Sequence, residues 1–171
     1  MSTNATETFI ISFLNYTSIH VLRTAYSFIK FMLPISLATS VEAIGKCVFD
    51  VGVIDALMMV SLGIGHFVDA IRPTKTPVND LLVGLVSCGL LYIVLCFCFN
   101  IEFLCNIWIL ALIMCINGYL QAYTWPNLLM IVHSQFDPDR YSALLGFWTT
   151  NVNFGNMMGF ILCQLVVGSE G

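Results

Sequence analysis

The sequence predicts an all-α membrane protein with five transmembrane helices in a single membrane domain. Of its 171 residues, 58% are hydrophobic and 9% are charged, and the mean hydropathy is +0.90. Soluble domains carry about 25% charged residues, so the lipid bilayer is the expected solvent. The sequence shows no alternating pattern of the kind that transmembrane barrels have. Apolar runs long enough to cross the hydrocarbon core instead alternate with short polar turns.

Polar residues mark the turns between the apolar segments. A loop containing Glu42, Lys46 and Asp50 follows the first segment, and the stretch RPTKTPVND, with two prolines, follows the second. Trp125-Pro126 interrupts the fourth segment. The membrane domain is predicted to cover residues 9–168. Its segments are expected at residues 9–38, 51–71, 81–99, 103–133 and 141–167, between tails at 1–8 and 169–171.

Basic residues in the short loops predict the orientation of the chain, because such residues concentrate on the inner side of a membrane. Arg72 and Lys75 lie between the second and third segments, and Arg140 lies between the fourth and fifth. Lys46 lies in a loop on the opposite side. This distribution predicts that the N-terminus is inside and the C-terminus outside.

Composition also excludes several classes of function. The net charge is −4 with six basic residues, so there is no basic patch for nucleic acid. No nucleophile, metal cluster or glycine-rich phosphate loop stands out, and the chain is not expected to be an enzyme or to hold a cofactor. The seven cysteines lack zinc-ligand spacing and are interpreted mainly as small buried apolar residues. The N-terminus has no basic region or cleavage motif, so no cleavable signal peptide is expected.

One face of the first segment carries polar residues that a lipid-facing helix would not have. At about 100° per residue, Tyr16, His20, Arg23, Ser27 and Lys30 share an arc of about 80°. An ionisable residue at the centre of a bilayer costs about 2.5–3.5 kcal/mol on insertion scales. The stripe is therefore expected to face protein or a water-filled cavity.

Three interpretations of this stripe remain open at the level of sequence. The first is an anion site, because arginine matches phosphate bidentately and the neighbouring side chains supply further hydrogen bonds. The second is a structural stripe that pairs with carboxylates, such as Asp55 or those of a partner chain. The third is snorkelling of the side chain to the membrane surface, which suits Lys30 better than Arg23.

The stretch YTSIHVLRTAYSFIK, residues 16–30, resembles the first helix of the organophosphate:phosphate antiporters of the major facilitator superfamily. That helix reads roughly Y-x-x-Y-H-x-x-R-K-x-x-S-x-x-K, and Ile19 and Thr24 depart from it. Residues 118–159 are similar to the fourth and fifth helices of the same family. The matching positions there are Gln121, Trp125, Pro126, His133, Arg140, Gly146, Trp148, Gly155 and Gly159.

A weaker match covers the second segment, residues 51–69. It resembles the family's second helix, which ends in the G-x-x-x-D signature, here Gly65 and Asp69. The stretch before Gly65 is about five residues short of the family pattern. The arginine that normally follows the aspartate is Ala70 in this chain.

The resemblance implies a mechanism and a fold. In the family, one arginine from the first helix and another from the C-terminal half grip the phosphate, and two six-helix halves rock around the site. Arg23 is the position carried over for the first arginine, and the small Gly155 and Gly159 would let the fifth helix pack closely. The expected fold is a truncated N-terminal half of such a transporter. The candidate anion-binding residues are Arg23, His20, Tyr16, Lys30 and Asn151.

The expected function is that of a transport-incompetent remnant of a phosphate/organophosphate antiporter. The family's tryptophan, asparagine and histidine on helix five read here as Trp148-Thr149-Thr150-Asn151, and no histidine is present. Such a remnant would act as an accessory or structural subunit of a larger membrane complex. Lipids and other membrane subunits covering the edge after the fifth helix are its expected partners, with phosphate or a phospholipid headgroup near Arg23. The alternative is half of a split antiporter completed by a second chain. The mitochondrial inner membrane is favoured over the endoplasmic reticulum.

Overall fold

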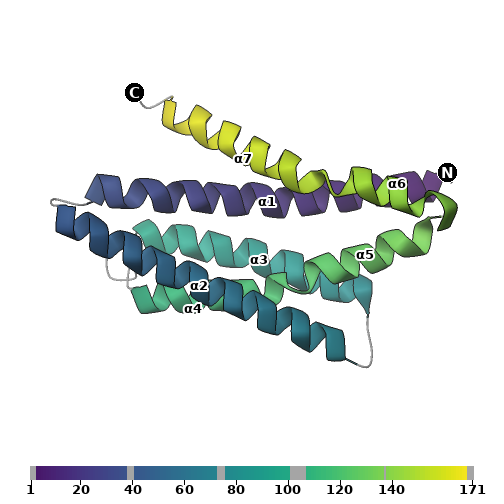
Figure 1. The fold of residues 1–171 in the computed structure, drawn as a ribbon, viewed down its shortest axis with the longest axis horizontal. Helices are drawn as coiled ribbons and strands as arrows, with labels where there is room; N and C mark the ends of the chain where they lie inside the picture. The colour runs from purple at the N-terminus through teal and green to yellow at the C-terminus, as the bar shows by residue number, and fades with distance from the viewer. Residues whose placement is uncertain (1–2, 38–40, 73–75, 101–106, 137, 169–171) are drawn as a thin grey trace. The chain divides into compact units, whose positions relative to one another are not determined.

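The computed structural model describes residues 3–37, 41–72, 76–100, 107–136 and 138–168, and these residues are almost entirely helical (Figure 1). The all-α fold class is therefore confirmed. The helices of the described residues are α1 (Thr3–Leu37), α2 (Val41–Ile71), α3 (Pro77–Asn100), α4 (Ile107–Gln121), α5 (Thr124–Gln135), α6 (Pro138–Trp148) and α7 (Asn151–Gly168).

The fourth predicted segment is divided into α4 and α5. Proline at 126 has no N–H for the carbonyl of Ala122, and its ring crowds that carbonyl, so the helix opens just upstream of the proline. The Thr124 hydroxyl donates to the carbonyl oxygen of Gln121 at 2.7 Å and satisfies a group that the break leaves open. The sequence therefore indicated the interruption, which lies a few residues before the proline itself.

The fifth predicted segment is also divided, into α6 and α7, although it contains no proline. The hydroxyls of Thr149 and Thr150 donate to the carbonyl oxygens of Gly146 and Phe147 at 2.8 and 2.7 Å. Hydroxyls that bond back to the preceding turn compete with the helical ladder and bend helices. This second interruption was not expected from the sequence.

Three expected boundaries are wrong. The expected loop with Glu42, Lys46 and Asp50 is the start of α2, which runs for 31 residues. A helix of that length is about 46 Å long, more than the hydrocarbon core of about 30 Å, and its candidate membrane span is the part from Val48 to Ile71. Most of the expected N-terminal tail belongs to α1, where Ala5 is buried. The third helix begins at Pro77 rather than at residue 81, because proline suits the first turn of a helix.

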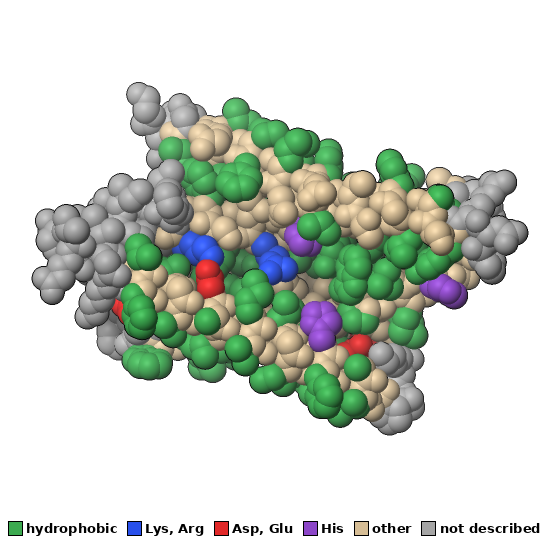
Figure 2. All heavy atoms as spheres, in the orientation of Figure 1, with side chains coloured by type: hydrophobic (Ala, Val, Ile, Leu, Met, Phe, Trp, Pro, Cys, Tyr) green, Lys and Arg blue, Asp and Glu red, His purple; other side chains and the backbone are tan. Residues whose placement is uncertain are grey.

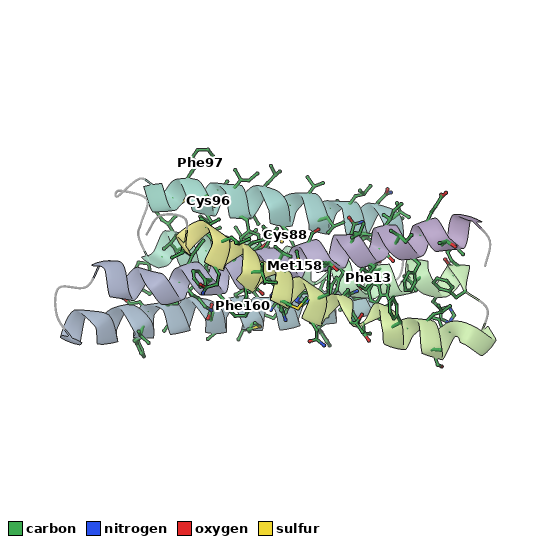
Figure 3. The ribbon with its side chains drawn as sticks, turned by 90° about the horizontal axis from the view of Figure 1, so that it is seen from above. Phe13, Cys88, Cys96, Phe97, Met158 and Phe160 are labelled. Atoms are coloured by element: carbon green, nitrogen blue, oxygen red, sulfur yellow. The ribbon has the colours of Figure 1, made fainter. Side chains whose placement is uncertain are left out.

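Two helices of the described part are long and apolar enough to cross a membrane by length and hydropathy alone, Val48–Ile71 and Pro77–Cys98. Hydrophobic side chains cover much of the face in view, with few charged ones between them (Figure 2). Phe97 points away from α3 and is 63% exposed (Figure 3). Large exposed apolar side chains of this kind suit contact with lipid.

The chain forms two compact units. The first comprises Met1–Leu33 and Leu128–Gly171, and the second comprises Pro34–Asn127. In the second unit, α4 packs against α2 and α3. Glycines permit this close approach: a Cβ added to Gly65 would lie 2.7 Å from the carbonyl oxygen of Tyr119, and one on Gly84 would lie 3.1 Å from the carbonyl oxygen of Leu120.

Candidate anion site on α1 and α7

In the first unit, α7 lies directly against α1 because two glycines leave room for it. A Cβ added to Gly155 would lie 2.6 Å from the carbonyl oxygen of Thr17, and one on Gly159 would lie 2.8 Å from the Cβ of Thr24. Such distances are shorter than side chains tolerate. The spacing of the two glycines therefore fixes which turns of α1 and α7 meet.

A buried tryptophan fixes the register between α1 and α6. Trp148 is fully buried, and its Nε1 donates to the hydroxyl of Ser12 at 3.0 Å. The Trp148 ring also stacks on Tyr16, with 5.8 Å between the ring centroids. These contacts hold the start of the candidate polar stripe against the end of α6.

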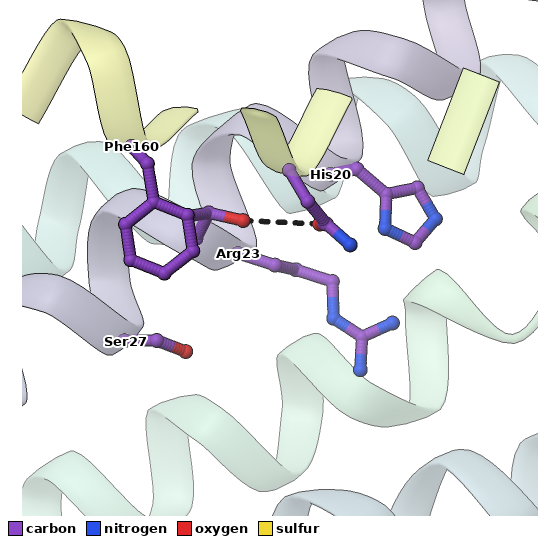
Figure 4. Close-up of a pocket in the computed structure, with 6 residues that line it drawn as sticks. His20, Arg23, Ser27 and Phe160 are labelled. Carbon is purple, nitrogen blue, oxygen red and sulfur yellow. Dashed lines mark hydrogen bonds between the residues drawn. The ribbon is translucent and has the colours of Figure 1, made fainter. Parts of the chain in front are cut away.

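The polar stripe of α1 opens into a cavity of about 380 Å³ (Figure 4). Among the described residues, those that line it come from α1 and α7: His20, Arg23, Thr24, Ser27, Asn156 and Phe160.

The cavity is rich in hydrogen-bond donors. The Thr24 hydroxyl donates to Oδ1 of Asn156 at 3.0 Å, so the amide nitrogen of Asn156 is left to donate elsewhere (Figure 4). The Arg23 guanidinium and the Ser27 hydroxyl add further donors, and no carboxylate is among the lining residues that the structure describes. Within the described residues of its own unit, Arg23 has no ion pair. The arrangement is suited to an anion.

The predicted anion-binding residues do not all reach this cavity. His20 and Arg23 line it. Tyr16 lies beside His20, with 4.9 Å between the ring centroids, but packs on Trp148 rather than lining the cavity. Lys30 lies 5.4 Å from the centroid of the Tyr26 ring.

Asn151, also predicted to bind the anion, is fully buried outside the cavity lining. Both polar atoms of its side chain lack a hydrogen-bond partner among the described residues. Asn156 occupies the cavity position instead. The one sequence signal for it is the position of this amide between Gly155 and Gly159, since small residues mark a helix face that packs against another helix.

The second unit holds a different polar cluster, at the adjoining ends of α2, α3 and α4. Arg72 bonds to Asp80, and its Nη2 lies 3.9 Å from Oδ1 of the buried Asp69. The guanidinium also lies 5.4 Å from the centroid of the Tyr123 ring. Position 70 is alanine, yet Asp69 has an arginine beside it, because Arg72 at the end of the helix reaches back one turn.

The other motif residues are not among the described residues that line the cavity. Nε2 of Gln121 donates to the sulfur of Cys88 at 3.7 Å inside the second unit. Trp125 and Pro126 lie in the first turn of α5. The side chain of Arg140 lies outside the described residues.

The fold and the cavity define a class: an α-helical membrane protein with a cationic, donor-rich cavity beside its first helix. The chain is 26% identical to glucose-6-phosphate exchanger SLC37A2 of Bos taurus over 184 aligned positions, which cover 94% of this chain and 37% of the relative. It is 24% identical to sugar phosphate exchanger 3 of Homo sapiens, covering 93% of this chain and 36% of the relative.

The resemblance to the organophosphate:phosphate antiporters of the major facilitator superfamily is thereby confirmed, and it concerns the N-terminal half of those proteins. The chain spans a little over one third of the length of these relatives. The relatives are exchangers, which agrees with the expectation that the chain is not an enzyme. No protein-family model and no solved structure matches the chain.

Proposed function

We propose that this chain serves as a structural or accessory subunit of a larger membrane protein complex and does not itself move an organophosphate across the membrane. In this role the exchanger-like helices form a scaffold that other subunits pack against. Arg23 holds an anion that stays bound and contributes to assembly.

The charge of the cavity carries this proposal. Phosphate monoesters such as phosphoserine carry about −1.5 to −2 charges at pH 7, whereas the lining residues include one arginine and, from α7, an amide and a phenyl ring. One guanidinium leaves a dianion partly uncompensated, and a charge that is not compensated is costly inside a membrane. Inorganic phosphate or a phospholipid headgroup that keeps part of its hydration shell suits this cavity better than a fully enclosed substrate.

A second candidate function is half of a split sugar-phosphate/phosphate antiporter. One observation favours it: the guanidinium of Arg23, the hydroxyl of Ser27 and the amide of Asn156 line one common space, and its described lining residues include no carboxylate. In this version a second chain supplies another guanidinium to the same anion. The two candidate functions differ in whether the assembled protein catalyses exchange.

The location follows from the same reasoning. We place the chain as an integral membrane protein with its N-terminus inside, because Arg72, Lys75 and Arg140 are expected near that side and Lys46 alone near the other. The mitochondrial inner membrane, with its large multi-subunit complexes, suits an accessory subunit better than the endoplasmic reticulum.

The test compares assembly with exchange. The native complex is isolated in mild detergent from cells carrying the parent chain or Arg23→Leu, and its amount is measured on native gels. The purified complex is then reconstituted, and exchange of radiolabelled phosphate is followed. Lys30→Leu is the matched control, since it removes a cation from the same helix without altering the cavity lining.

We expect the Arg23→Leu chain to yield less complex, the Lys30→Leu chain to yield normal amounts, and the parent complex to show no phosphate exchange. Normal assembly of the Arg23→Leu chain, together with exchange that only the parent complex catalyses, would establish the split antiporter instead.

A further inference from the structure

The cavity beside Arg23 offers a ligand one permanently charged group and several neutral hydrogen-bonding groups. Arg23 is the only lysine or arginine among the described residues that line it. Lys30, farther along α1, has its Nζ 5.4 Å from the centroid of the Tyr26 ring and is not one of those lining residues. The permanent positive charge that the described lining supplies is therefore that of a single guanidinium.

The buried ring of His20 indicates that a ligand binds in this cavity. The residue is 9% exposed, and its Nε2 has no hydrogen-bond partner in the part of the chain that the structure describes. A buried polar atom without a partner is costly. In the tautomer with its hydrogen on Nε2, His20 would donate to an oxygen of a ligand beside Arg23. The Ser27 hydroxyl and the Asn156 amide nitrogen are further donors.

Charge balance distinguishes between the oxyanions that such donors could hold. A phosphate monoester carries about −1.5 to −2 charges near neutral pH, whereas a phosphodiester carries a single negative charge, as each phosphate of DNA does. Arg23 compensates one charge, and a second charge without a cation is costly within a membrane. The fork of the guanidinium also matches the two unesterified oxygens of a diester.

The cavity has space and an apolar wall for an ester group. Its volume of about 380 Å³ lies within the range of about 300–1,000 Å³ that is typical of small-molecule sites. The Phe160 ring, which is 55% exposed, and the His20 ring lie on opposite sides of the close-up (Figure 4). The phenyl ring can contact an esterified carbon while the polar side chains hold the phosphate oxygens.

We propose that the cavity beside Arg23 binds phosphodiesters, which carry one negative charge, in preference to doubly charged phosphate groups. The inference rests on the proposed function, because it assigns a ligand class to the anion site that the proposed function uses. The phosphodiester comes either from the headgroup of a membrane phospholipid or from a soluble glycerophosphodiester. Both sources present the same group to Arg23, and the experiment has one arm for each.

The soluble arm measures binding by calorimetry to the full chain, purified in a detergent without phosphate groups. The ligands are dimethyl phosphate, a singly charged diester, and methyl phosphate, which is a dianion at about pH 8. We expect dimethyl phosphate to bind at least about tenfold more tightly at this pH, because the second charge of methyl phosphate has no cation. The difference should shrink toward about pH 5, where methyl phosphate is singly charged.

The lipid arm measures which phospholipid the full chain retains. The chain is reconstituted with equal amounts of phosphatidylmethanol, whose phosphate is a diester, and phosphatidic acid, whose phosphate is a monoester. Bound lipid is then identified by native mass spectrometry at about pH 8. Retention of phosphatidylmethanol in excess of phosphatidic acid, lost in Arg23→Leu, would identify a phospholipid as the source. Binding of dimethyl phosphate without a retained lipid would identify a soluble diester.

Three variants connect this preference to the charge of the cavity. Arg23→Leu should abolish binding of both methyl esters, and Lys30→Leu, the matched control on the same helix, should change neither. Ser27→Arg adds a second guanidinium at an exposed position of the lining. It should therefore strengthen the binding of methyl phosphate and reverse the order of the two affinities.

Two results would overturn the inference, and they differ in what they mean for the proposed function. Methyl phosphate that binds the parent chain as tightly as dimethyl phosphate at about pH 8, with both lost in Arg23→Leu, would overturn the preference and retain the anion site. Binding of none of these phosphates in either arm would overturn both the preference and the anion site on which the proposed function relies.

Discussion

Two arginines, one in each unit, have opposite surroundings. Arg72 of the second unit bonds to Asp80, lies near the buried Asp69 and covers the ring of Tyr123. Arg23 of the first unit lines a cavity with hydroxyls, an amide and a phenyl ring, and the described part of the lining contains no carboxylate. An arginine with internal partners stabilises the protein, whereas one whose cavity supplies no anion is available to a ligand.

The largest expected effect comes from removing the paired arginine. Arg72→Leu leaves two carboxylates without their cation, one of them buried, and we expect the free energy of unfolding to fall by about 3 kcal/mol. Equilibrium unfolding in mixed micelles measures it. Arg23→Leu is the matched control, and it should change the free energy of unfolding of the isolated chain by less than about 0.5 kcal/mol. Equal losses for the two variants would remove the distinction between them.

The next effect concerns the helix pair that builds the cavity. Gly155→Ala places a Cβ 2.6 Å from the Thr17 carbonyl oxygen and 2.7 Å from the Cβ of His20, so α1 and α7 must separate. We expect a loss of about 2 kcal/mol in stability, together with weaker phosphate binding in calorimetry. A Cβ added to Gly146 would have no heavy atom within 4 Å, so Gly146→Ala should have little effect on either measurement. Unchanged stability of Gly155→Ala would mean that the two helices do not meet at this glycine.

A smaller effect is expected at the contact between α1 and α6. Trp148→Phe keeps an aromatic ring beside Tyr16 but removes the hydrogen bond to Ser12. Thermal unfolding should report a loss of about 1 kcal/mol. Trp108→Phe, at a side chain that is 74% exposed, is the control in the second unit and should have no measurable effect. A null result for Trp148→Phe would show that the ring contact, without the hydrogen bond, sets the register.

The last effect is similar in size and has the opposite sign. Asn151→Leu replaces a fully buried amide, with both polar atoms unpartnered among the described residues, by an apolar side chain of similar volume. Removing an unsatisfied polar group should raise the unfolding free energy by about 1 kcal/mol.

The control for this change is Asn127→Leu. The Asn127 amide nitrogen donates to the carbonyl oxygen of Tyr123 at 2.6 Å, so this substitution should lower stability in the same unfolding assay. Destabilisation by Asn151→Leu would instead reveal that its amide holds a bound water or ligand.

Several features of the fold follow from local sequence. Composition and the length of the apolar runs predicted the all-α membrane fold, because the bilayer requires every backbone hydrogen bond to be made within a span. Proline at 126 predicted an interruption of the fourth segment, since a proline has no N–H to continue the backbone hydrogen bonds of the helix. Thr149 and Thr150 gave no such signal, because the same hydroxyls are also found in uninterrupted helices.

The candidate site was predicted only in part, for a physical reason. The 100° rotation per residue placed His20 and Arg23 on one face, since that relation is local to a helix. It could not place Asn156, because the contact between α7 and α1 depends on where two glycines allow the backbones to approach. The arginine beside Asp69 is different, because positions 69 and 72 are one helical turn apart and their spacing alone indicates that the two side chains can meet.

The sequence by itself indicated that the chain belongs in a lipid bilayer, that its fold is all-α and that it resembles an antiporter family. It also showed an unusual arginine in the first segment. Each of these rests on composition or on spacing within one helix. Tertiary structure decided which arginine is paired and which amide of α7 lines the cavity. Those outcomes depend on the register between helices, and register is set by side-chain volumes at contacts that are far apart in the chain.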